Sequence, residues 1–312
     1  MTWASYWDGR SRAPLRIGIA AIAAVVLFVE SWQIDWQARD PIRFPPSGVL
    51  AETLATIPGA AWILYALVLV GLVALALDRR PIAAGLWAIA WAALQSEWQT
   101  QIFGSPSRNA FFPGAVLLGW VLGQAWARLV AHESGTSTSR AFRERLAEAG
   151  ALACIAAAYV GSCLSKLLAA GLAWADGTSV RALVLWQQPL ADWAWLAAYR
   201  QTILDVPALA SVASIVTLAI EGGAFLLLFG PRLRMLWAAL IVGLHLNITL
   251  LCTMPYLEPM ALLALFVVPW PGLRALAEPP APEQPAIPRR VKAMLVAVVV
   301  LAWLLQPWGW RG

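Results

Sequence analysis

Three ionisable side chains lie within long apolar stretches of the chain, and their types suit them to chemistry. Lys166, Glu221 and His245 fall in three successive stretches of this kind. A charged group at the centre of a bilayer costs about 2.5–3.5 kcal/mol on insertion scales, so such a group is expected to face protein and not lipid. Burial disfavours the charged form of an amine, and we predict that Lys166 is at least partly neutral and acts as a general base. A carboxylate in contact with it would keep it cationic, and the sequence does not give its distance from Glu221.

Further polar residues accompany these three side chains at helical spacing. The stretch that contains Lys166 carries these polar residues at positions i, i+3, i+4 and i+7, which form one face of a helix. The sets are Tyr159, Ser162, Cys163 and Lys166, then Ser214, Thr217 and Glu221, and then His245, Thr249 and Cys252, with Asn247 as a further candidate. If these faces meet, they enclose an outward-facing polar pocket within the bilayer. The structural alternatives are packing contacts for the small residues, a hydrogen-bonded histidine, and an ion pair between Lys166 and Glu221.

A second group of polar residues lies towards the outer ends of other apolar stretches. Glu97 and Asn109 are candidate pocket-lining residues from this group. The alternative for Glu97, and for Glu30 at the end of the first stretch, is a hydrated interfacial charge. Asn109 precedes an apolar stretch, where the alternative role is the N-cap of a helix.

The composition indicates a membrane protein. Of the 312 residues, 61% are hydrophobic and 12% are charged, whereas soluble globular domains carry about 25% charged residues. A membrane span needs roughly 20 mostly apolar residues, and we count nine candidates, with eight as the alternative. They are residues 15–32, 60–77, 82–94, 111–130, 150–173, 208–230, 233–252, 257–268 and 291–305. The predicted fold is an all-α, polytopic bundle of transmembrane helices.

The loops predict the orientation and the organisation of the chain. Basic residues concentrate in the loops that are internal if the N-terminus is cytoplasmic, so we place the N-terminus inside, in a bacterial inner membrane. The outer loop at residues 174–207 is rich in tryptophan and is expected to lie along the membrane interface as amphipathic helix. Residues 1–270 are predicted to form the main transmembrane domain, 271–290 a Pro-rich cytoplasmic linker, and 291–312 a C-terminal transmembrane helix.

The residue inventory argues against several functional classes. The three cysteines all lie in apolar segments and form no CxxC pair, which argues against a disulfide framework and a thiolate metal cluster. The net charge of +5 comes from arginines between apolar segments, which is a pattern of membrane topology and not of nucleic-acid binding. We therefore predict no metal and no nucleic-acid partner, and the expected partner is the lipid bilayer.

Several of these motifs resemble one membrane protein family. Residues 159–166, YVGSCLSK, followed by 174–177, WADG, resemble the signature helix and WxxG step of the vitamin K-dependent gamma-carboxylase-like proteins. Their bacterial relatives are the horizontally transferred transmembrane (HTTM) domain proteins. Glu221 falls where this family carries an acidic residue. Residues 244–247, LHLN, and the run to Met254 and Glu258 resemble its later histidine-containing span. The resemblance covers roughly half of the chain and rests on the order and spacing of these motifs.

The resemblance implies residue roles and a cofactor. Lys166 would be the base that deprotonates a reduced quinone, His245 would support it in the pocket, and Glu221 would tune the lysine. The chain departs from the family at Ser165, where the family has a second lysine, and at Ala110, where it has a histidine. The implied activity is therefore a related quinone- or oxygen-linked modification, such as peptide maturation, of a peptide or small molecule from the periplasmic side. The alternatives are a transporter or lipid-binding protein, or a structural partner subunit without catalysis.

Overall fold

The computed structural model describes residues 12–267, except for 41, 46, 104–107, 134–138 and 255. Within this part of the chain the regular structure is helical, with eleven α-helices and two 3-10 helices. This confirms the all-α prediction. The described helices form two compact units, unit 1 (residues 12–154) and unit 2 (residues 155–267), and α7 contributes to both. The linker predicted at 271–290 and the helix predicted at 291–312 lie outside the described residues.

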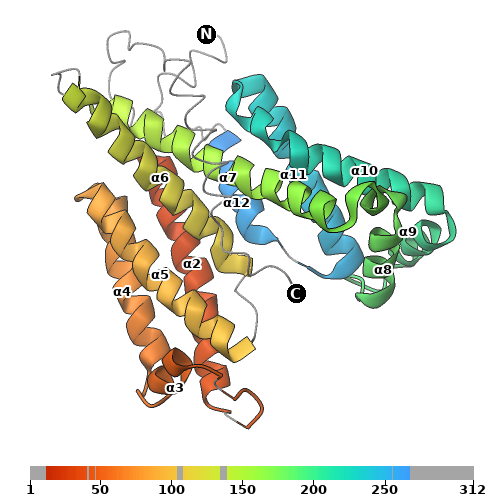
Figure 1. Cartoon of the computed structure of the whole chain (residues 1–312), viewed down its shortest axis with the longest axis horizontal. Helices are drawn as coiled ribbons and strands as arrows, with labels where there is room; N and C mark the ends of the chain where they lie inside the picture. The colour runs from red at the N-terminus through yellow and green to blue at the C-terminus, as the bar shows by residue number, and fades with distance from the viewer. Residues whose placement is uncertain are drawn as a thin grey trace. The chain divides into compact units, whose positions relative to one another are not determined.

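Unit 1 is built mainly from long helices that lie side by side (Figure 1). Its helices are α2 (Ala13–Ala38), α3 (Val49–Ala55), α4 (Ala60–Ala76), α5 (Pro81–Phe103), α6 (Arg108–Glu133) and the first half of α7 (Arg140–Ala170). Between α6 and α7 the backbones approach closely, because a Cβ added to Gly119 would lie 2.2 Å from the carbonyl oxygen of Gly150. Close packing through small residues is typical of helices in membranes.

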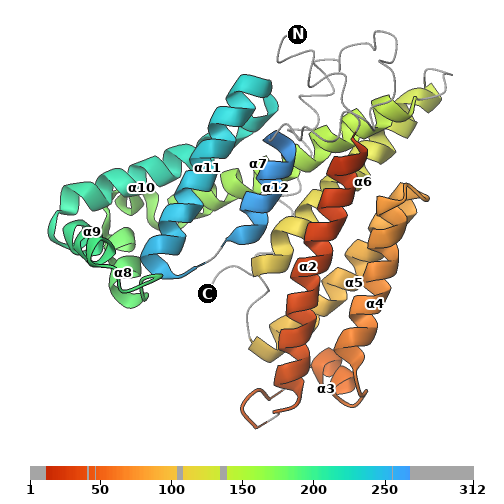
Figure 2. The ribbon, with the colours of Figure 1, turned by 180° about the vertical axis from the view of Figure 1, so that it is seen from behind.

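Unit 2 places two short helices at one end of two long ones, as seen from both sides in Figures 1 and 2. After α7 follow η1 (Gly171–Asp176), α8 (Thr178–Trp186), α9 (Ala194–Asp205), α10 (Pro207–Gly222), η2 (Gly223–Leu228), α11 (Pro231–Cys252) and α12 (Leu257–Val267). Arg200 of α9 donates hydrogen bonds to the carbonyl groups of Val184, Gln187 and Leu251. It therefore satisfies carbonyl groups at the C-terminal ends of α8 and α11, which a helix cannot satisfy internally.

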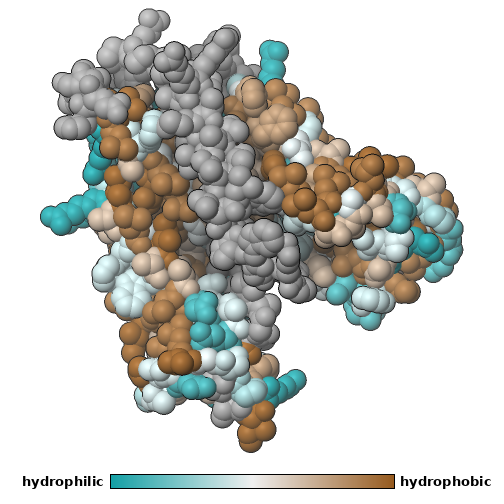
Figure 3. Space-filling model, viewed as in Figure 1, coloured by the Kyte–Doolittle hydropathy of each residue, from teal (hydrophilic) through white to brown (hydrophobic). Residues whose placement is uncertain are grey.

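Among the described residues, five helical segments are long and apolar enough to cross a membrane. They are Ala13–Ala38, Phe111–Ala131, Arg140–Asp176, Pro207–Leu228 and Pro231–Cys252, and the pair α3 and α4, bent by 102°, would be a sixth. α12, described over Leu257–Val267, is a shorter apolar helix in this part of the chain. Large apolar side chains are exposed on α10 and α11, among them Val212, Ile215 and Leu236 (Figure 3). By helix hydropathy the chain is an integral membrane protein.

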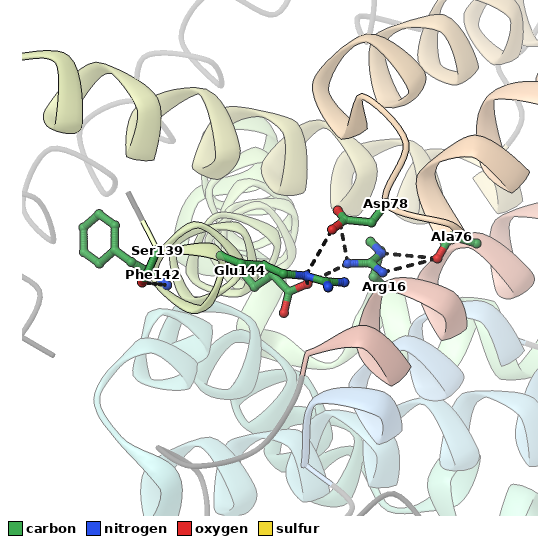
Figure 4. A network of polar contacts seen from close by, with 7 residues as sticks. Arg16, Ala76, Asp78, Ser139, Phe142 and Glu144 are labelled. Atoms are coloured by element: carbon green, nitrogen blue, oxygen red, sulfur yellow. Dashed lines mark hydrogen bonds and ion pairs between the residues drawn. The ribbon is translucent and has the colours of Figure 1, made fainter. Parts of the chain in front are cut away.

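Charged side chains connect the ends of α2, α4 and α7 within unit 1 (Figure 4). Arg16 Nη1 lies 2.6 Å from Glu144 Oε1 and 3.3 Å from Asp78 Oδ1. The same guanidinium donates to the carbonyl oxygen of Ala76, and Arg140 Nε lies 3.1 Å from Asp78 Oδ2. Arg16 is only 3% exposed, so these partners compensate a charge that would be unfavourable if buried alone.

Candidate functional site

Lys166 and Glu221 are in direct contact within unit 2. Lys166 lies near the end of α7 and Glu221 near the end of α10, and Lys166 Nζ is 2.5 Å from both carboxylate oxygens. Ser162, one helical turn before Lys166, accepts a hydrogen bond from Nζ at 2.9 Å and donates one to Glu221 Oε1 at 3.3 Å. The side chains of Lys166 and Glu221 are 23% and 9% exposed. This contact favours the ammonium form of Lys166 in the resting state, because an adjacent carboxylate stabilises the cation.

The indole ring of Trp174 also contacts the ammonium group of Lys166. Trp174 belongs to η1, and Lys166 Nζ lies 5.2 Å from the centroid of its ring. A cation at this distance from an aromatic face is attracted by the ring quadrupole. The ammonium group therefore has a carboxylate, a hydroxyl and an aromatic ring as protein partners, and it does not depend on reaching the membrane surface.

Gly177 fixes the turn that holds Trp174 in place. Its φ is +87°, and a Cβ at this position would lie 2.5 Å from the backbone nitrogen of Ser211 on α10. Both the left-handed backbone and the close approach of α10 therefore require glycine. Ser211 Oγ donates to the carbonyl oxygen of Asp176 at 2.6 Å, and the N–H of Thr178 donates to Asp176 Oδ1 at 2.7 Å. The glycine of the WxxG motif thus has a structural role in this chain.

A second polar group is centred on His245 of α11. His245 Nε2 lies 2.6 Å from the hydroxyl oxygen of Tyr159, and its ring centroid lies 4.8 Å from that of Tyr256. Tyr159, Ser162 and Lys166 occupy positions i, i+3 and i+7 of α7, so the ion pair and the histidine group lie along one face of that helix. Glu258, two residues after Tyr256, is 7% exposed. We call Tyr159, Ser162, Lys166, Glu221, His245, Tyr256 and Glu258 the polar cluster.

Irregular backbone lies next to both parts of the polar cluster. Directly after Glu221, α10 ends at Gly222 and continues as the 3-10 helix η2, and such a stretch within a long helix often marks a functional or strained position. After α11, Thr253 has a φ of 49°, and the chain turns back so that Tyr256 packs on His245. His245 lies seven residues before the end of α11, which is about 10 Å along the helix axis from that end.

The structure brings together part of the site predicted from sequence. Tyr159, Ser162, Lys166, Glu221 and His245 join the polar cluster, and Cys163 Sγ lies beside it at 3.5 Å from the carbonyl oxygen of Leu218. The remaining candidates of this unit have other contacts. Thr217 and Thr249 donate to backbone carbonyl groups of their own helices, and Thr249 also donates to that of Met254 after α11. Asn247 accepts a hydrogen bond from Tyr199 of α9 at 3.1 Å.

The candidates near the outer ends of other stretches belong to unit 1. Glu97 is exposed and accepts a hydrogen bond from Gln101 at 2.9 Å, in agreement with the interfacial alternative. Asn109 lies within α6, which begins at Arg108, so it is not the N-cap. The interpretation of Glu30 as a hydrated charge that closes the first span is wrong. α2 continues to Ala38, and Glu30 is 1% exposed.

Sequence reasoning missed two members of the polar cluster and one of its neighbours. Glu258 entered only as part of the family resemblance, without a role in the site. It is a carboxyl group within the predicted span 257–268, so the cost argument applied to Lys166 applies to it as well. Tyr256 carries no such signal, because its place depends on the turn after α11. Trp174 was recognised as part of a motif, but its contact with Lys166 was not predicted.

No known protein family, curated protein or solved structure matches this chain. The resemblance to the gamma-carboxylase-like proteins therefore stays a prediction that rests on the quoted residues. Within the described part of the chain, no three or more His, Cys, Asp or Glu side chains are grouped so as to hold a metal ion.

Proposed function

We propose that unit 2 carries the reaction centre of an integral membrane enzyme of the gamma-carboxylase-like, HTTM type. Lys166 is its base, Glu221 is the proton partner of the lysine, and His245 is a hydrogen-bonding pocket residue. The proposal is supported by the Lys166–Glu221 contact, which lies along the same face of α7 as the Tyr159–His245 hydrogen bond. The nine spans, the cytoplasmic N-terminus, the outward-facing pocket and the bacterial inner membrane are part of this proposal.

Proton transfer within the ion pair is the step that frees the amine. When a proton moves from Lys166 to Glu221, two charged groups become two neutral ones and the net charge of the pair is unchanged. A poorly hydrated environment penalises charged groups more than neutral ones, so it makes this transfer accessible. The lone pair of Lys166 can then accept a proton from a substrate. Ser162 contacts both groups, and its hydroxyl can donate and accept, so it can hold them in line in either state.

His245 and Tyr159 are suited to orient the group that loses its proton. Nε2 of His245 is engaged by Tyr159, whereas Nδ1 is buried without a hydrogen-bond partner among the described residues. A buried polar atom of this kind is usually satisfied by a ligand or water. A reduced quinone fits the residues present, because its hydroxyl groups can bond to His245 and its ring can pack against Tyr256 or Trp174. When bound, it would supply the electrons for an oxygen-linked modification of a peptide or small molecule from the periplasmic side.

The proposal can be tested by following oxygen-dependent oxidation of a reduced menaquinone analogue by the full-length protein in lipid nanodiscs. Lys166→Ala should lower the rate by about 100-fold or more while the protein still inserts and melts cooperatively. Thr217→Ala is the matched control, because Thr217 bonds only to its own helix, and it should keep the wild-type rate. An unchanged rate in Lys166→Ala, or no oxidation by the wild type, would contradict the proposal.

A structural ion pair is the second candidate, because the ammonium group of Lys166 already has a full set of protein partners. In that case Lys166→Met combined with Glu221→Leu should preserve both folding and activity, since no unpaired charge remains. For an enzyme, the same double variant should fold but lose activity. A transporter or lipid-binding protein would instead show altered flux or binding with no chemically changed product.

A further inference from the structure

The polar cluster contains one lysine and two carboxyl groups, and only one of these carboxyl groups is matched by a cation. Glu221 pairs with Lys166. Glu258 lies at the second position of α12 and is 7% exposed. It takes part in none of the ion pairs found among the described residues. Its Oε1 atom is buried and has no hydrogen-bond partner in that part of the chain.

The position of Glu258 at a helix start does not account for these properties. The partial positive charge at the N-terminus of α12 favours a carboxylate there. This field does not provide a hydrogen bond to Oε1, however. A buried carboxylate with an unbonded oxygen is unfavourable, whereas a neutral carboxylic acid is easier to desolvate and has an O–H group to donate.

A histidine with an unused nitrogen atom belongs to the same cluster. The other titratable groups of the cluster are Tyr159 and Lys166 of α7, Glu221 of α10, His245 of α11, and Tyr256 from the turn before α12. The ring of Tyr256, two residues before Glu258, lies 4.8 Å from that of His245, and His245 Nε2 lies 2.6 Å from the Tyr159 hydroxyl oxygen. His245 is 6% exposed, and its Nδ1 atom also lacks a hydrogen-bond partner among the described residues. Two side chains that are more than nine-tenths buried thus carry unused polar atoms in one cluster.

We propose that Glu258 is a proton-binding site that is held as a neutral carboxylic acid at neutral pH. Ionisation would release this proton and leave a buried carboxylate whose Oε1 atom has no hydrogen-bond partner among the described residues. This inference does not depend on the proposed enzymatic function, because a transporter could use the same proton.

Infrared difference spectroscopy of the full-length protein in lipid nanodiscs tests this proposal through the carbonyl stretch of protonated carboxyl groups. We expect a band at neutral pH that disappears as the pH is raised and Glu258 ionises. The band should be missing in Glu258→Gln and retained in Glu97→Gln, whose carboxylate is exposed. If Glu258→Gln leaves the spectrum of protonated carboxyl groups unchanged, the proposal is wrong.

Thermal stability gives an independent test of the same proton. A neutral carboxylic acid and a carboxamide are similar in shape, so Glu258→Gln should fold and melt as the wild type does at mildly acidic pH. As the pH rises, the wild type should lose stability relative to Glu258→Gln, because its folded state binds a proton that its unfolded state has released. A variant that is unfolded or much less stable at every pH would show that Glu258 is ionised in the native protein, which overturns the proposal.

Discussion

The contact between Lys166 and Glu221 predicts a thermodynamic coupling that a double-mutant cycle can measure. Lys166→Met would leave the carboxylate of Glu221, whose side chain is 9% exposed, without its cation. Removing one partner of a buried ion pair costs about 3–5 kcal/mol. The side chain of Lys166 is 23% exposed, so some hydration of the site remains, and we expect a loss near the lower end, about 3 kcal/mol.

The reciprocal change should cost less. Glu221→Leu leaves the ammonium group of Lys166 with Ser162 and Trp174 as partners and with partial access to solvent. We expect a loss of about 1–2 kcal/mol, typical of a single charged hydrogen bond. The double variant buries neither charge and should be less destabilised than the sum of the two single variants. The expected coupling energy lies within the range of about 0.5–3 kcal/mol for residues in contact, towards its upper end.

Thermal denaturation of the purified protein in detergent measures these differences. In soluble proteins of 150–250 residues, 1 kcal/mol shifts Tm by about 2–4 °C, so Lys166→Met should lower Tm by roughly 6–12 °C. The matched control is Arg39→Met, which breaks an ion pair to Asp35 with an arginine side chain that is 75% exposed. That change should cost less than about 1 kcal/mol. A Lys166→Met variant as stable as this control, or strictly additive losses in the double variant, would refute the reasoning.

Three further substitutions test the surrounding fold by thermal denaturation or proteolysis. Arg16→Ala should cost about 3 kcal/mol or more, because Glu144 loses a buried partner; a silent variant would contradict the described network. Gly177→Ala should cost about 1–3 kcal/mol from backbone strain, besides the clash with α10, and an unchanged Tm would argue against the tight turn. Arg200→Lys keeps the charge but loses the planar group that bonds three carbonyl oxygens. It should speed proteolysis between α8 and α9, and unchanged cleavage would show that these bonds do not hold the segment.

The positions of most helices could be predicted from the sequence, because apolar runs identify helical segments in a membrane. The predicted end at Cys252 agrees with the end of α11, and the predicted span 208–230 coincides with α10 and η2. α2 and α5 extend beyond their predicted ends. Within the bundle, Gln95 Nε2 donates to Ser31 Oγ at 3.0 Å and to the carbonyl oxygen of Leu27 at 3.1 Å. Polar side chains that bond to each other across two helices can be buried, so a helix can extend past its apolar run. The hydropathy of one segment alone does not reveal this.

The candidate site could be predicted only in part. The cost of burying Lys166 and Glu221 made them identifiable, but their distance stayed open and an ion pair between them was one alternative. The orientation of each helix about its axis was not predictable, and for this reason Asn247 faces α9 and Thr217 bonds to its own helix. The turn at Thr253 has no signal in hydropathy, so the contact between Tyr256 and His245 could come only from the three-dimensional structure.

The central claim is that Lys166 and Glu221 share a protonation equilibrium away from water. Nitrogen NMR of protein labelled only at lysine tests this claim most directly. The chain has two lysines, Lys166 and Lys292, so a Lys292→Arg background leaves a single side-chain signal. We predict an ammonium signal at neutral pH with Glu221 present. In Glu221→Gln we predict that the ammonium signal is lost at a lower pH than with Glu221 present, because the cation keeps Ser162 and Trp174 but loses its carboxylate partner. Loss of the signal at the same pH in both proteins would contradict the account.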